Sequence, residues 1–67
     1  MLIQCFHSSA SEVTLEKLFQ LTTSVGGWTS IYPYAYSMDI YIPEDYSTWA
    51  ILLDPTIERR PKLDYIA

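Results

Sequence analysis

The sequence has few of the residues from which reactive and metal-binding sites are built. It contains one cysteine, Cys5, so no disulfide can form within the chain. Cys5 and the single histidine, His7, offer two ligands, whereas a closed zinc site needs about four. The only two glycines, 26 and 27, are adjacent and match no phosphate-binding loop. We therefore expect no structural metal and no cofactor.

Basic residues are scarce as well. Four Lys and Arg face eight Asp and Glu, which gives a net charge of −4 and a pI near 4.5. A general nucleic-acid binder needs a basic surface, so this class is excluded. Charged residues make up only 18% of the chain, which is thin for a DNA mimic, and we keep mimicry only as a minor alternative. The 49% hydrophobic content excludes a disordered acidic tail.

Targeting signals are not apparent in the sequence. Residues 1–7 lack the basic start and the long apolar core of a signal peptide. An uncharged run from 18 to 38 is long enough to span a bilayer, but polar residues, two glycines and Pro33 interrupt it. We expect a cytoplasmic protein without a transmembrane segment.

The first part of the chain predicts a strand followed by a helix. Residues 1–7 are apolar and contain no helix breaker, so we interpret them as a strand. Ser9 and Ser11 are alternative N-caps for the next segment, in which apolar residues from 15 to 25 follow helical spacing. The glycine pair 26–27 is expected to end this helix.

The second part predicts two strands. Large side chains at even positions from 32 to 42 alternate with small or polar ones, as in a half-buried strand. Pro33 limits this strand to 34–42 or places it at an edge. Residues 43–47 form a polar turn, and the continuous apolar run 49–53 predicts a central strand covered on both faces.

These elements predict an α+β fold of the order β-α-β-β. We expect a three-stranded, mostly antiparallel sheet with strand order 1-3-2 (alternatively 1-2-3) and one helix on one face. Residues 1–57 would form a single domain and 58–67 an irregular C-terminal tail. A domain of about 60 residues buries only roughly 60% of its unfolded surface, and one helix cannot cover both faces of a sheet. The uncovered face is then an expected interaction surface.

No catalytic constellation is evident. Cys5 and His7 lie two residues apart, but no third group or oxyanion hole can be assigned to them. The carboxylates that could work in pairs belong to predicted loops and strand ends: Asp39, Glu44, Asp45 and Asp54. We therefore expect that the protein is not an enzyme.

Aromatic residues give the clearest functional signal. Six tyrosines and two tryptophans occur in 67 residues, and these side chains dominate the energetics of many interfaces. Acidic neighbours would steer the domain towards a basic partner surface. The candidate partner-binding residues combine aromatic, acidic and tail basic groups: Trp28, Tyr32, Asp39, Glu44, Asp45, Tyr46, Arg59, Arg60 and Tyr65.

The sequence thus favours a non-enzymatic, small acidic protein-binding module. An inhibitor or an accessory subunit fits this description, for example a phage or mobile-element inhibitor of a host protein. One alternative is a self-associating homodimeric domain that encloses a small ligand among its aromatic side chains. Another is a subunit of a larger membrane-associated complex.

Overall fold

The computed structural model describes residues 2–32 and 36–66, with side chains described through residue 60. It confirms the α+β class. Along the chain the elements are β1 (Leu2–Ser8), α1 (Glu12–Ser24), β2 (Trp28–Tyr32), β3 (Ser37–Pro43), the short 3-10 helix η1 (Glu44–Tyr46), α2 (Ser47–Leu53) and β4 (Glu58–Ile66).

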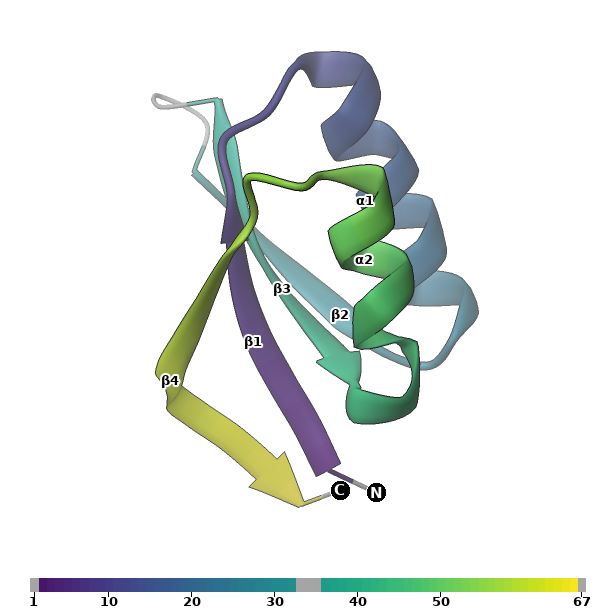
Figure 1. The fold of residues 1–67 in the computed structure, drawn as a ribbon, viewed down its shortest axis with the longest axis vertical. Coiled ribbons are helices and arrows are strands. Elements are labelled where there is room, and N and C mark those ends of the chain that lie inside the picture. Colours follow the sequence, from purple (N-terminus) through teal and green to yellow (C-terminus); the bar gives the residue numbers. More distant parts are fainter. Residues whose placement is uncertain (1, 33–35, 67) are drawn as a thin grey trace.

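The strands form one antiparallel sheet with the order β2-β3-β1-β4. β3 and β1 are the central strands, and β2 and β4 are the edges. Both helices lie on the same side of the sheet, and β4 bends along its length on the far edge (Figure 1). The molecule therefore has two layers, with helices on one face of the sheet only.

The prediction of three strands and one helix is wrong, because the segment 49–53 is part of α2. A short apolar run does not by itself distinguish a buried strand from a helix. Here Ala50 and the leucines favour a helix, and η1 leads directly into it. Asp54 adopts an extended conformation before Pro55, where helical geometry is disfavoured, and α2 ends there.

The strand predicted for 34–42 corresponds to β3, and β2, which pairs with β3 as a hairpin, was not predicted. Tyr36 adopts a left-handed conformation with φ 47° immediately before β3. The even residues of β3 face the helices, as in the predicted alternation. In β2, however, the odd residues face the helices, because Ile31 pairs with Met38 and Tyr32 with Ser37. Residues 33–35, including Pro33, lie outside the described residues.

The C-terminal tail predicted to be irregular is also a strand. β4 pairs with β1 from Leu2↔Ile66 to His7↔Glu58, with a shift in register between Ile3 and Cys5. Pro61 lies in the irregular part of β4, where a residue without an N–H is tolerated. The earlier interpretation missed this strand because its charged residues and proline do not alternate with apolar ones.

The predicted helix is confirmed as α1. Ser11, one of the two predicted N-caps, caps it, since its Oγ accepts a hydrogen bond from the Thr14 amide (3.4 Å). Gly26 follows the helix with φ +88°, a conformation that favours glycine. Gly27 packs so closely that a Cβ there would collide with the carbonyl oxygen of Tyr41. The glycine pair therefore ends α1 and allows the chain to approach β3 closely where β2 begins.

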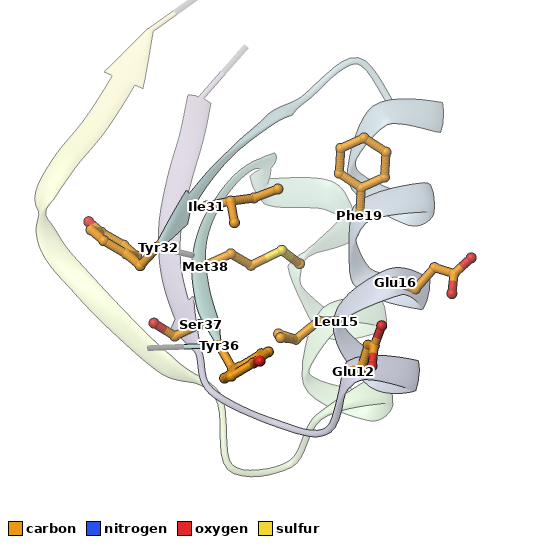
Figure 2. A pocket seen from close by; sticks show the side chains of 9 residues that line it. All are labelled: Glu12, Leu15, Glu16, Phe19, Ile31, Tyr32, Tyr36, Ser37 and Met38. Atoms are coloured by element: carbon orange, nitrogen blue, oxygen red, sulfur yellow. The ribbon is translucent and has the colours of Figure 1, made fainter. Parts of the chain in front are cut away.

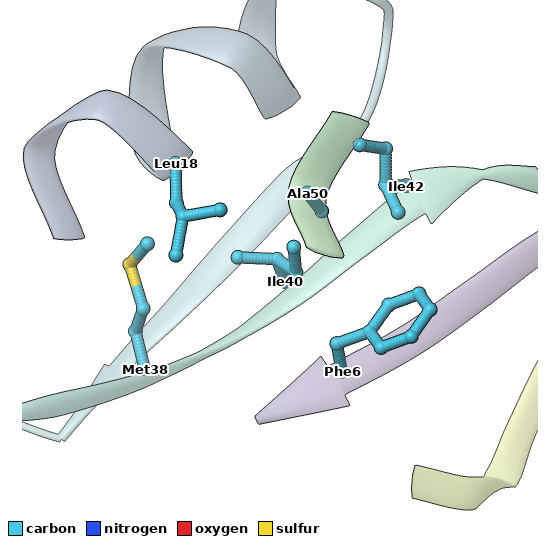
Figure 3. Packing of buried hydrophobic residues seen from close by; sticks show 6 residues of the cluster. All are labelled: Phe6, Leu18, Met38, Ile40, Ile42 and Ala50. Carbon is cyan, nitrogen blue, oxygen red and sulfur yellow. The ribbon is translucent and has the colours of Figure 1, made fainter. Parts of the chain in front are cut away.

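The core lies between the sheet and the two helices (Figure 3). Its buried members come from β1, β3, α1 and α2 and are Phe6, Leu18, Met38, Ile40, Ile42 and Ala50. Half-buried residues pack around this cluster: Leu15, Leu21, Val25 and Ile57. α2 contributes only the small Ala50 to the buried cluster, and its other apolar side chains are exposed.

A buried carboxylate connects β1 to the end of α2. Asp54 accepts hydrogen bonds from the hydroxyls of Ser8 and Thr56, both at 2.6 Å, and from the Thr56 amide at 3.1 Å. Burial raises the pKa of Asp54, but the three hydrogen bonds together lower it by more than burial raises it. The net pKa of Asp54 therefore lies below its usual value. The charged form of Asp54 is thus favoured in the folded protein.

Candidate functional site

The face of the sheet without helices carries a cluster of polar and aromatic side chains. Residues that pair directly across antiparallel strands share a face. By this register Trp28, Tyr41 and Cys5 form one row across the sheet, and Asp39 and His7 belong to the next row. The helix-free face therefore carries polar and ionisable side chains beside its aromatic rings.

Asp39 is the centre of this cluster. It is 3% exposed, and one carboxylate oxygen lies 2.7 Å from Nδ1 of His7. The other oxygen accepts a hydrogen bond from the Tyr32 hydroxyl, also at 2.7 Å. This hydrogen bond, together with the negative charge of Asp39, raises the pKa of Tyr32. Asp39 thus holds both rings in place.

Aromatic packing and burial limit what this face can do chemically. Trp28 and Tyr41 stack with ring centroids 5.3 Å apart and planes 10° apart. Cys5 is fully buried, so its thiol is shielded from solvent. The His7–Asp39 pair supplies the orienting carboxylate that the sequence did not reveal. In the described part of the chain, no group of three or more His, Cys, Asp and Glu side chains is arranged to hold a metal ion.

A groove lies on the other side of the sheet, between α1 and the β2–β3 hairpin (Figure 2). Its volume is about 500 Å³, and most of its walls are apolar. Ile31 and Met38 extend from the sheet towards α1, whose Leu15 points back at them. The full lining is Glu12, Leu15, Glu16, Phe19, Ile31, Tyr32, Tyr36, Ser37 and Met38.

Among the residues that the structure describes, the charged side chains that line this groove are all acidic. Glu12 and Glu16 are exposed and stand one helical turn apart on α1. Neither of them forms an ion pair within the part of the chain that the structure describes. The groove therefore combines an apolar interior with a negatively charged rim.

α2 forms a third surface of interest. Trp49, Ile51, Leu52 and Leu53 are all exposed, and Leu52 reaches 74% exposure. A helix on the surface of a monomeric protein normally turns a polar face to water. α2 has almost no such face, since only Ser47 and Thr48 among its seven residues are polar.

The structure separates the predicted binding residues into several places. Trp28 and Tyr32 are exposed on β2, and Asp39 lies beside them but is buried and therefore presents no surface charge. Glu44, Asp45 and Tyr46 are exposed on η1. The remaining three predicted residues lie on β4. Arg59 and Arg60 belong to β4, as does Tyr65, whose side chain is not among those described.

Sequence reasoning missed the groove. Glu12, Glu16 and Phe19 are spaced by four and three residues, which places them on one side of a helix, and this spacing is visible in the sequence. Ile31 could not be found in the same way, because the sequence did not predict the β2–β3 hairpin that turns it towards α1.

Comparisons with protein-family models, curated proteins and solved structures gave no significant match for this chain. No helix in the described part of the chain has the length and apolar character needed to cross a membrane.

Proposed function

We propose that this chain is a small acidic domain that binds another protein through exposed apolar and aromatic side chains, without catalysing a reaction. An inhibitor or an accessory subunit would act in this way. The observation that carries the proposal is the imbalance between core and surface. Eleven large hydrophobic side chains are exposed in the described residues, whereas the buried core contains eight hydrophobic residues.

The energetic argument concerns the surface that remains in water. Covering about 500 Å² of apolar surface contributes on the order of 12 kcal/mol before the costs of association. That amount is comparable to the whole stability of a typical domain. The exposed residues of α2 and of the groove are large enough to supply such an area, so a protein partner is the favoured occupant.

The test uses three lysine substitutions that add the same charge at exposed positions. Leu52→Lys changes α2, Ile31→Lys changes the groove, and Gln20→Lys is the matched control on α1. Each tagged protein is incubated with lysate of the cells that express the chain, and the retained proteins are quantified by mass spectrometry. We expect a protein that wild type and Gln20→Lys retain equally and that Leu52→Lys or Ile31→Lys loses. The proposal is wrong if no protein shows this pattern.

Self-association is the second candidate, and the exposed α2 favours it. A two-fold interface needs only one self-complementary patch, which four apolar side chains on one short helix can provide. Sedimentation at micromolar concentration separates the two candidates. A dimer that Leu52→Lys dissociates would support self-association, and a monomer would exclude it at that concentration.

A further inference from the structure

The two edge strands of the sheet differ in their chemistry. β4 carries Glu58, Arg59 and Arg60, followed by Pro61 and a register shift. Charges, proline and irregular backbone are the features that prevent another strand from pairing with an edge. β2, in contrast, has the sequence Trp-Thr-Ser-Ile-Tyr, with no charge and no proline, and four of its five residues are exposed.

The unprotected edge is next to the groove. Ile31 of β2 is 63% exposed and forms part of the wall of the groove that faces α1. A strand that paired with β2 would continue the sheet, so every second side chain would point to the helix side, as Ile31 does. Those side chains would enter the groove, whose volume of about 500 Å³ lies in the range of ligand pockets.

The rim of the groove determines the charge of such a strand. Glu12 and Glu16 line the groove from α1, and no cation in the described part of the chain forms an ion pair with them. The whole chain has a net charge of −4, which attracts basic segments and repels acidic ones. The same charge opposes a second copy of this chain at the site.

We infer that β2 and the adjoining groove bind an extended basic segment of a partner protein, which adds to β2 as a fifth strand. Apolar side chains on its helix-facing side occupy the groove between Leu15, Ile31 and Met38. Lysine or arginine side chains on the same side lie against Glu12 and Glu16. This inference rests on the proposed function, because it specifies the part of the surface and the chemistry through which a partner is recognised.

The direct test uses a ten-residue probe peptide in which every second residue is threonine and the residues between them alternate valine and lysine, so that valine and lysine share one face. It is titrated into the ¹⁵N-labelled full chain. We expect amide shifts in residues 28–32 and around the groove, and at least about tenfold slower hydrogen exchange at β2 amides once they are paired. Two control peptides replace all lysines by glutamates or one central valine by proline, and both should bind more weakly. Equal binding of the glutamate peptide, or unchanged exchange of residues 28–32, would overturn the inference.

Variants then locate the contacts. The double variant Glu12→Gln/Glu16→Gln keeps exposed side chains of the same shape and should weaken peptide binding by roughly five- to tenfold at low salt. Ile31→Lys should abolish binding, whereas Leu52→Lys on α2 should leave it unchanged. The assignment to this groove is wrong if the Glu12→Gln/Glu16→Gln variant binds the peptide as tightly as wild type, or if Leu52→Lys abolishes binding. Both outcomes can be measured even if Ile31→Lys fails to fold.

The outcomes also separate this inference from the proposed function. If the lysate partner is lost by Leu52→Lys but retained by Ile31→Lys, the domain binds proteins through α2 and the inference is wrong. If no lysate protein is retained by any variant, the proposed function fails. If the chain sediments as a dimer and the amides of residues 28–32 are protected from hydrogen exchange without peptide, a second copy occupies the site and the inference is again wrong.

Discussion

The hydrogen bond between Ser8 and Asp54 makes the most quantitative prediction. Asp54 is buried at the end of α2, and Ser8 is buried at the end of β1, with 2.6 Å between the Ser8 hydroxyl and the carboxylate. We expect Ser8→Ala to lower the free energy of unfolding by about 2 kcal/mol, since a hydrogen bond to a charged group contributes about 1.5–3 kcal/mol. Asp54→Ala removes the two bonds from Thr56 as well. Because Thr56 is exposed, we expect a total loss of about 3–4 kcal/mol rather than the sum of three full bonds.

Urea unfolding of the two single variants and the double variant measures this pair. If the two side chains act through one bond, the losses are not additive, and the coupling free energy should be about 1–2 kcal/mol. Trp49 on α2 provides a fluorescence signal close to Asp54 in the chain. Additive losses within about 0.3 kcal/mol would refute the reasoning, because they would mean that Ser8 and Asp54 stabilise the fold independently.

The pH dependence gives an independent check. The folded-state pKa of Asp54 lies below its usual value of 3.8, so the unfolded chain takes up this proton first as the pH falls. The stabilisation from Asp54 is therefore complete above about pH 5 and is lost as the pH falls through the lowered folded pKa. We expect Asp54→Ala to be flatter than wild type in a plot of stability against pH below 5. A variant whose acid sensitivity equals that of wild type would contradict the assignment.

Three further substitutions have defined outcomes. Thr22→Val replaces a buried hydroxyl that has no hydrogen-bond partner in the described structure, so we expect the urea midpoint to rise by the equivalent of about 1 kcal/mol; a fall would show that the hydroxyl is satisfied. Gly27→Ala places a Cβ against the carbonyl of Tyr41, and we expect a loss of about 3 kcal/mol in the same assay, whereas a neutral result would mean that the start of β2 moves easily. Tyr36→Gly removes the backbone strain of a left-handed tyrosine that is 77% exposed, so the midpoint of thermal unfolding should rise by a few degrees. An unchanged or lower midpoint would show that the tyrosine ring stabilises the turn.

Local signals in the sequence predicted the first half of the fold well. The strand that became β1 and the helix α1, with its Ser11 cap and its stop at Gly26, depend on neighbouring residues and could be recognised directly. The run 49–53 could not be assigned in this way, because its apolar residues suit a strand and a helix equally. Its state depends on packing: once β4 occupies the edge beside β1, the segment 49–53 has no place in the sheet.

The candidate site shows the same division. The exposure of Trp28, Tyr32 and Tyr46 agrees with the expectation that aromatic residues reach the surface. The burial of Asp39 could not be predicted in this way. It involves His7, which is 32 residues away in the chain and becomes a neighbour of Asp39 only through the pairing of β1 with β3. The groove likewise depends on a turn that reverses which residues of the hairpin face α1.

The pairing of β1 with β4 has a consequence for synthesis. β1 is the first described element to be translated and β4 the last, yet Leu2 and Ile66 are partners. Until residues 58–66 have emerged from the ribosome, β1 is itself an open edge, and Ile3 and Cys5 lack the neighbour that borders them in the finished sheet. A chain cut before residue 58 would thus expose an apolar, aggregation-prone edge strand. Such fragments are natural substrates for chaperones and proteases.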